Sequence, residues 1–169
     1  MGVVRGLIKS NYLRFFLKYI EPVSEKIKQG LYSGVELENF VDWEIIIGFQ
    51  FENLVLNNIK SVCKLLSISM SSVKSAAPYY QNKTQRQNAC QIDLLIQTKY
   101  TLYVCEIKFR RKIAKSIINE VQRKVDNIGP KKGFSIRPVL IYNKGFVHSI
   151  LEEKYFDRVI CFEDLLTTK

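Results

Sequence analysis

The sequence has little of several residue types on which common active sites depend. Its 169 residues include one histidine, four cysteines and four prolines. With His148 alone, a Ser-His-Asp triad or a multi-histidine metal site is hard to build. The cysteines, Cys63, Cys90, Cys105 and Cys161, are too far apart to form a C-x-x-C zinc site or redox pair. We therefore expect reduced, mostly buried thiols.

Long apolar runs are also missing. Segments such as 44–51 and 92–96 are far shorter than the roughly 20 residues that span a bilayer. The first nine residues carry charge and have no apolar stretch followed by a small-residue cleavage site, so they do not read as a secretory signal. We expect a cytoplasmic protein without a membrane partner.

What the chain has in excess is positive charge. Lysine and arginine number 26 against 16 aspartates and glutamates, a formal charge of +10, which favours a polyanionic partner, with nucleic acid ahead of an anionic membrane surface. One basic cluster follows a strand-like segment and consists of Lys108, Arg110, Arg111, Lys112 and Lys115. It is either a patch that binds phosphates or simply a solvated strand end and helix start.

Apolar periodicity predicts two long helical segments in the first third of the chain. The first covers about 11–29, with a kink at Pro22, and the second covers about 41–66, with a break near Asn57 and Asn58. The expected buried stripe of the second segment is Trp43, Ile46, Ile47, Phe51, Leu54, Val55 and Ile59.

The rest of the chain alternates strands and helices. A polar loop over 81–91 precedes strands at 92–97 and 102–109, which form a hairpin. An amphipathic helix at 114–128, short strands at 138–142 and 159–162 and a terminal helical turn then follow. With 47% hydrophobic residues, the chain can bury a core. The pattern predicts an α/β fold with a mixed central β-sheet flanked by helices.

Charged residues lie inside two of the strands. Alternation along 102–109 places Val104, Glu106 and Lys108 on one face, and Asp93 lies in the apolar partner strand. Charges in such strands are unfavourable unless they are paired or bound to a metal. One interpretation is an ion pair of Lys108 with Asp93 or Glu106. The other is a Mg²⁺ and phosphate site at one end of the sheet, built by two carboxylates and a lysine.

An aspartate followed by Glu-x-Lys on the next strand resembles the PD-(D/E)XK nuclease superfamily. More closely, the segments GFQFENLV at 48–55, QIDLL at 91–95 and YVCEIKF at 103–109 resemble the C-terminal nuclease-like domain of bacterial and archaeal AAA-type ATPases. The segments EVQRK at 120–124, RPVLI at 137–141 and YLRFF at 12–16 continue the similarity. The Gly-x-x-x-x-Gly-Lys-Ser/Thr sequence of the ATPase is absent from this chain, so either this is an excised domain or a homologue that stands alone.

The resemblance implies a restriction-endonuclease-like α-β-β-β-α-β core over 41–169, after an N-terminal helical extension over 1–40. It also implies site residues. Glu52, Asp93 and Glu106 would be catalytic carboxylates that bind Mg²⁺ or Mn²⁺, with Ile107 as a further metal-ligand position and Lys108 as the catalytic lysine. Glu120 and Lys124 are secondary candidates; alternatively they form a solvent-facing ion pair one helical turn apart.

Two functions follow as expectations. The first is a metal-dependent DNA nuclease that hydrolyses phosphodiester bonds with a metal-activated water, and that forms a homodimer if it cuts both strands. The alternative is a catalytically silent DNA- or partner-binding module related to the domain of an ATPase. The sequence does not distinguish double-stranded, single-stranded or branched DNA as the substrate.

Overall fold

The computed structural model describes residues 13, 15–34, 36, 43–85, 87–110, 113–128, 133–143 and 148–167. The chain divides into two compact units, with the boundary between Gln50 and Phe51, inside helix α3 (Trp43–Asn57). The division expected from the sequence, into 1–40 and 41–169, stays a prediction. Within the described ranges, no helix is both long and apolar enough to cross a membrane.

The described part of the first unit contains short helical segments followed by a non-helical stretch at 31–34. A π-helical turn η1 (Phe16–Ile20) leads into a 3-10 turn η2 (Glu21–Val23) and helix α2 (Ser24–Lys28). The expected irregularity at Pro22 is thus present, since proline lacks the N–H that would continue a helical hydrogen-bond ladder. Tyr19 is buried in this unit, with its ring 5.5 Å from that of Phe15.

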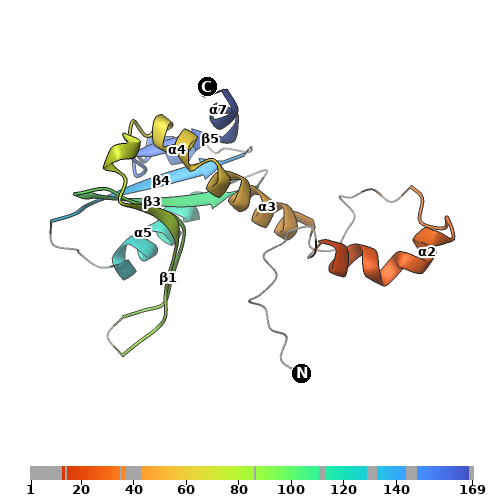
Figure 1. Ribbon diagram of the computed structural model, residues 1–169. Coiled ribbons are helices and arrows are strands. Elements are labelled where there is room, and N and C mark those ends of the chain that lie inside the picture. The colour runs from red at the N-terminus through yellow and green to blue at the C-terminus, as the bar shows by residue number, and fades with distance from the viewer. Residues whose placement is uncertain are drawn as a thin grey trace. The chain divides into compact units, whose positions relative to one another are not determined.

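The second unit is built on a five-stranded mixed sheet, and its strands follow the chain order (Figure 1). The strands are β1 (Ser75–Gln81), β2 (Cys90–Gln97), β3 (Thr101–Lys108), β4 (Ser135–Tyr142) and β5 (Arg158–Cys161). β1, β2 and β3 are antiparallel neighbours, whereas β4 and β5 continue the sheet in parallel. The predicted fold class is therefore confirmed, and the element order α-β-β-β-α-β is present.

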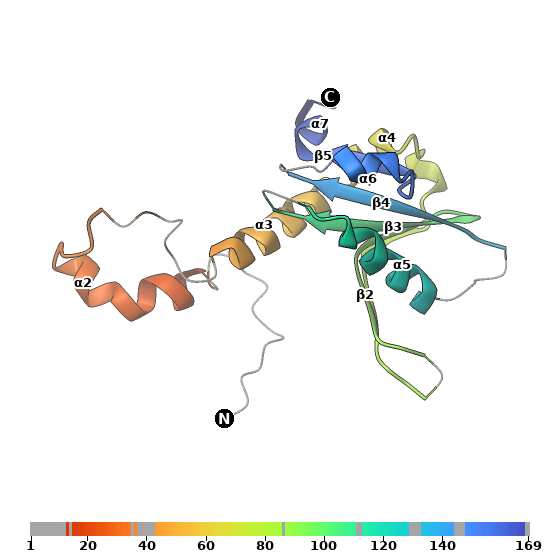
Figure 2. The same ribbon diagram turned by 180° about the vertical axis from the view of Figure 1, so that it is seen from behind.

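Helices cover both faces of this sheet (Figures 1 and 2). One apolar cluster joins the sheet to α3, α4 (Ile59–Leu65) and α7 (Phe162–Thr167), and the other joins it to α5 (Ser116–Ile128) and α6 (His148–Glu152). β3 contributes to both clusters, as its alternation predicted: Cys105 and Ile107 lie in the first, and Leu102 and Val104 lie in the second. Glu106 shares the face of Leu102 and Val104 and therefore lies on the α5 side.

A β-bulge in the middle of β2 shifts the alternation of its side chains between the two faces of the sheet. Ala77 pairs with Leu95 but Tyr79 pairs with Ile92, so Pro78 stands opposite two residues, Asp93 and Leu94. Proline cannot donate a hydrogen bond to a neighbouring strand, which makes this a natural place for the irregularity. Ile92 consequently belongs to the α5-side cluster, whereas Leu94 belongs to the opposite one.

Two sequence-based expectations need correction. Leu54 was placed in the buried stripe of α3, but it is 43% exposed, and among the stripe residues of this helix only Phe51 and Val55 are buried. The polar loop is also shorter than 81–91, since Gln81 closes β1 and β2 starts at Cys90. The predicted helix break is confirmed, with Asn58 between α3 and α4.

The packing of α5 against the sheet gives a first prediction. Ile117 is 4% exposed in the α5-side cluster, so Ile117→Ala should lower the free energy of unfolding by about 2–4 kcal/mol through lost burial and a residual cavity. Asn119→Ala on the exposed face of the same helix serves as the control and should change it by less than about 0.5 kcal/mol. Urea denaturation measures both. Equal values for the two variants would contradict the packing described here.

Candidate active site

The candidate site lies where β2 and β3 separate. The two strands pair from Gln97 opposite Leu102 only as far as Leu94 opposite Cys105, although β2 continues to Cys90 beside β1. Figures 1 and 2 show the β1–β2 ribbon turning away from the sheet beyond this point. At the separation the Asp93 carboxylate replaces a strand partner: its Oδ2 accepts a hydrogen bond of 2.9 Å from the Ile107 N–H.

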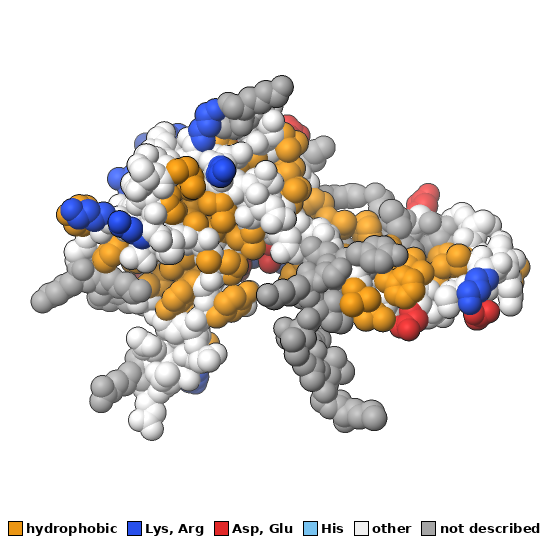
Figure 3. Space-filling model, viewed as in Figure 1, with side chains coloured by type: hydrophobic (Ala, Val, Ile, Leu, Met, Phe, Trp, Pro, Cys, Tyr) orange, Lys and Arg blue, Asp and Glu red, His pale blue; other side chains and the backbone are white. Residues whose placement is uncertain are grey.

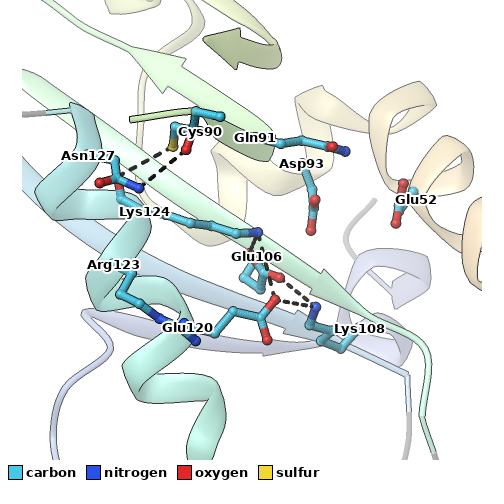
Figure 4. Close-up of a pocket in the computed structure, with 11 residues that line it drawn as sticks. Glu52, Cys90, Gln91, Asp93, Glu106, Lys108, Glu120, Arg123, Lys124 and Asn127 are labelled. Atoms are coloured by element: carbon cyan, nitrogen blue, oxygen red, sulfur yellow. Dashed lines mark hydrogen bonds and ion pairs between the residues drawn. The ribbon is translucent and has the colours of Figure 1, made fainter. Parts of the chain in front are cut away.

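A pocket of about 520 Å³ opens at this separation (Figure 4). Glu52 from α3, Asp93 from β2, and Glu106 and Lys108 from β3 all line it, so the structure brings together the four residues proposed as catalytic. The remaining lining residues come from the start of β2 and from α5: Ala89, Cys90, Gln91, Glu120, Arg123, Lys124 and Asn127. Ile107 contributes its N–H to Asp93, and its side chain packs in the opposite cluster.

Glu106 is the one charged side chain that is fully buried in the described part of the chain. Lys108 Nζ lies 2.7 Å from its Oε1, and Lys124 Nζ donates a hydrogen bond of 2.5 Å to its Oε2. The Glu106–Lys108 ion pair considered in the sequence analysis is therefore present. Oε1 nevertheless receives no hydrogen bond of regular geometry from the described residues, which leaves it an acceptor with unused capacity.

α5 delivers two more charged groups to the pocket. Glu120 Oε1 accepts a hydrogen bond of 3.0 Å from Lys108 Nζ and lies 4.0 Å from Lys124 Nζ one helical turn away. The side chain of Lys124 is only 18% exposed, so its main contact is Glu106 and not a solvent-facing pair with Glu120. The structure thus places both secondary candidates beside Glu106 and Lys108 (Figure 4).

Burial and, after it, the crowding of carboxylates raise the pKa values of two glutamates. Burial, followed by repulsion from Asp93 and Glu106, raises the pKa of Glu52 to about 7, although Lys108 and Lys124 act in the other direction. Burial and the charge of Asp93 also raise the pKa of Glu106, and the two lysines offset part of this effect. Glu52 is therefore poised to gain or lose a proton near neutral pH.

The lysine in the middle of the network stays charged. Burial alone would lower the pKa of Lys108, but the charge of Glu106 and the contacts with Glu106 and Glu120 more than offset it, so the pKa lies above its usual range. Burial would likewise raise the pKa of Glu120, and Lys108 instead brings it below its ordinary value. Lys108 therefore suits charge neutralisation better than proton abstraction.

The residues of the pocket fit a hard cation of the Mg²⁺ type. Mg²⁺ commonly binds through one or two carboxylates, keeps several waters and takes further oxygens from a phosphate. Asp93 and Glu106 supply two carboxylates in one pocket, and Oε1 of Glu106 has spare acceptor capacity. In the described ranges no three His, Cys, Asp or Glu side chains are close enough together to hold an ion by themselves.

The basic cluster proposed for nucleic-acid binding is only partly described. Arg111 and Lys112 lie outside the described residues, and Arg110 is exposed near Lys108. The Lys115 ammonium forms an ion pair with Glu153, which offsets its charge. On the face of the sheet-containing unit in Figure 3, the described lysines and arginines lie in separate places and do not form one band.

Several pocket residues were not identified from the sequence. Arg123 and Asn127 extend the polar face of α5 at the three- and four-residue spacing of Glu120 and Lys124, which is a signal that could have found them. Asn127 Nδ2 donates a hydrogen bond of 3.3 Å to the Ala89 carbonyl and so connects α5 to the start of β2. The four cysteines are free thiols, three of them buried, as expected.

The solved structures that are similar to this chain include the crystal structure of a repair endonuclease from Pyrococcus abyssi. The two chains are 19% identical and superpose with a TM-score of 0.43, over 78% of this chain and 50% of the endonuclease. This chain thus spans about half the length of that enzyme. Similarity at this level assigns no role to any residue here. No protein-family model matches the chain, and no curated protein matches it.

The raised pKa of Glu52 predicts a pH-dependent stability. Its pKa is about 7 in the folded chain against an ordinary value of 4.5, so between these values the unfolded chain has released a proton that the folded chain keeps. This contribution lowers the free energy of unfolding as pH rises through that window.

Glu52→Gln removes this ionisable group. Above about pH 7 its free energy of unfolding should therefore exceed that of the wild type by about 1–2 kcal/mol, the size expected for a half-buried group. Urea unfolding in EDTA at about pH 5 and about pH 8 provides the comparison. A difference between the two proteins that does not change with pH would mean that Glu52 titrates as it does in water.

Proposed function

We propose that the chain is a Mg²⁺- or Mn²⁺-dependent deoxyribonuclease that hydrolyses phosphodiester bonds at this pocket. The observation that carries the proposal is the convergence of Asp93 and the buried Glu106 with Lys108, where β2 leaves β3. A buried carboxylate is unfavourable for folding unless its charge is compensated, so its presence suits a site that handles cations.

Each pocket residue would have a separate role in the reaction. Asp93 and Glu106 would hold the cation, with Asp93 kept in place by the Ile107 N–H. When bound, Mg²⁺ would lower the pKa of a water molecule and neutralise phosphate charge. Lys108, charged at neutral pH, would stabilise the negative charge that develops on the phosphate. Glu52, which lines the same pocket from α3, would add a third carboxylate beside the cation.

The net charge of +10 supports a polyanionic substrate; Arg123 in the pocket and Arg110, which lines a smaller hollow with Lys108 and Glu120, add local positive charge. DNA is the substrate we propose on this basis and on the sequence resemblance.

A second candidate, the catalytically silent binding module, is favoured by one observation. Lysines lie within ion-pair distance of both oxygens of Glu106, so the charge of the carboxylate is neutralised without a metal. The two functions differ in whether divalent ions bind and whether DNA is cut.

Divalent-ion binding should depend on the two carboxylates. We expect calorimetry with Mn²⁺ to show weak binding by the wild type that is lost in Asp93→Ala and in Glu106→Ala, because each variant removes one of the two oxygen donors. Asp157→Ala, at the ion pair with Arg137 outside the pocket, is the charge-matched control and should bind like the wild type. Unchanged Mn²⁺ binding in both pocket variants would contradict the metal site and favour the interpretation that these residues only form ion pairs.

Cleavage should depend on Lys108. We expect the purified chain to cut plasmid, linear or branched DNA with Mg²⁺ or Mn²⁺ but not with EDTA. Lys108→Ala should lower the rate by about 10²-fold or more, since it removes charge stabilisation at the reacting phosphate, while Mn²⁺ binding persists. Lys99→Ala, at the far hairpin between β2 and β3, removes the same charge and should leave the rate unchanged. A wild type inert on every DNA would favour the silent module.

A further inference from the structure

The ion pairs around Glu106 hold it in a state that competes with metal binding. Each oxygen of this buried carboxylate faces an ammonium group, Oε1 that of Lys108 and Oε2 that of Lys124. A cation at Glu106 would have to share this fully buried carboxylate with two positive charges, and like charges repel each other strongly where they are largely removed from solvent. One of the two lysines therefore has to give way.

The two lysines are not equally able to leave. Lys108 stands two residues from Glu106 on the same face of β3 and is also hydrogen-bonded to Glu120 at 3.0 Å. Lys124 reaches Glu106 from α5, and its Nζ lies 4.0 Å from Glu120 Oε1 on the preceding turn of its own helix. A small rotation of the Lys124 side chain would move its ammonium group from the buried Glu106 to Glu120, whose side chain is 42% exposed. Lys124 can thus move without becoming unpaired.

We infer that Lys124 is the resident counter-ion of Glu106, and that Glu120 receives Lys124 when a divalent cation binds Glu106. The inference rests on the proposed metal site but not on DNA cleavage. Lys124 is a positioning residue in this scheme: it keeps Glu106 neutralised and the pocket folded in the absence of metal. Glu120 lowers the barrier to metal entry because it offers a partner of the same chemistry within one helical turn.

The scheme makes opposite predictions for the two α5 residues. Lys124→Met keeps the apolar stem but removes the competing charge, so Mn²⁺ affinity should rise by about tenfold or more. Glu120→Gln removes the alternative acceptor and should weaken Mn²⁺ binding. Arg123→Met is the matched control, because it removes one positive charge from the adjacent position of α5, where the Arg123 Nε donates to the Asn119 carbonyl and not to Glu106. Arg123→Met should change the affinity much less than Lys124→Met does.

The decisive measurement is calorimetric Mn²⁺ titration of these variants and of the double variant Lys124→Met/Glu120→Gln, all without DNA. If Glu120 acts through Lys124, its substitution should lose most of its effect once Lys124 is absent, so the two changes should be non-additive. Additive effects, or a Lys124→Met variant that binds Mn²⁺ no more tightly than Arg123→Met, would overturn the inference. Should Lys124→Met fail to fold by circular dichroism, Lys124→Gln retains a donor for Glu106 without the charge and is expected to show the same gain.

Cleavage assays on the same proteins separate this inference from the proposed function. Tighter Mn²⁺ binding by Lys124→Met in a chain that cuts no DNA would uphold the counter-ion role and overturn the nuclease. DNA cleavage by the wild type, together with no gain in Mn²⁺ affinity in Lys124→Met, would support the nuclease and overturn the counter-ion role of Lys124.

Discussion

A carboxylate without access to water must be neutralised, and in this fold the requirement falls on Glu106. β3 lies inside the sheet with a helix layer on each face, and Glu106 lies on the face that α5 covers, where it has no exposed surface. A positively charged side chain that neutralises Glu106 has to come from the same strand or from the helix that covers it. Lys108 comes from the strand and Lys124 comes from α5. The position of α5 is thus fixed by an electrostatic contact as well as by its apolar stripe.

This double attachment joins the site to the rest of the fold. Ile117 and Val121 bury one side of α5 against the sheet, and the neighbouring turns carry Glu120 and Lys124 into the pocket. At the end of the helix, Asn127 is hydrogen-bonded to the backbone at Ala89, just before β2. The helix that completes the α5-side core is therefore also the wall of the pocket.

Much of this arrangement was predictable from the sequence because it follows from local patterns. The two-residue alternation along β3 assigned Glu106 and Lys108 to one face, and the three- and four-residue spacing in 114–128 predicted α5 and its buried stripe. Asn57 and Asn58 signalled the break between α3 and α4. The hairpin pattern also predicted that Asp93 and Glu106 share one end of the sheet, whereas the approach of Glu52 was predicted only through the resemblance to a nuclease superfamily.

The rest depends on contacts between distant segments, which no local pattern contains. The bulge at Asp93 and Leu94 arises from Pro78 on the neighbouring strand. The ion pair of Lys124 with Glu106 joins residues 18 positions apart, whereas the spacing alone suggested a partner at Glu120. The exposure of Leu54 could not be predicted from the α3 sequence either, because the apolar residues of that helix are not confined to one face.

The bulge in β2 also separates chemistry from packing. On one side of it Ile92 belongs to the α5-side cluster, and on the other Leu94 belongs to the opposite cluster, while Asp93 between them belongs to neither. The strand therefore supplies an apolar residue to each core without either core having to accommodate the acid. The contacts of the Asp93 side chain are therefore the Ile107 N–H and the pocket, whereas the apolar packing of β2 is carried by its neighbours.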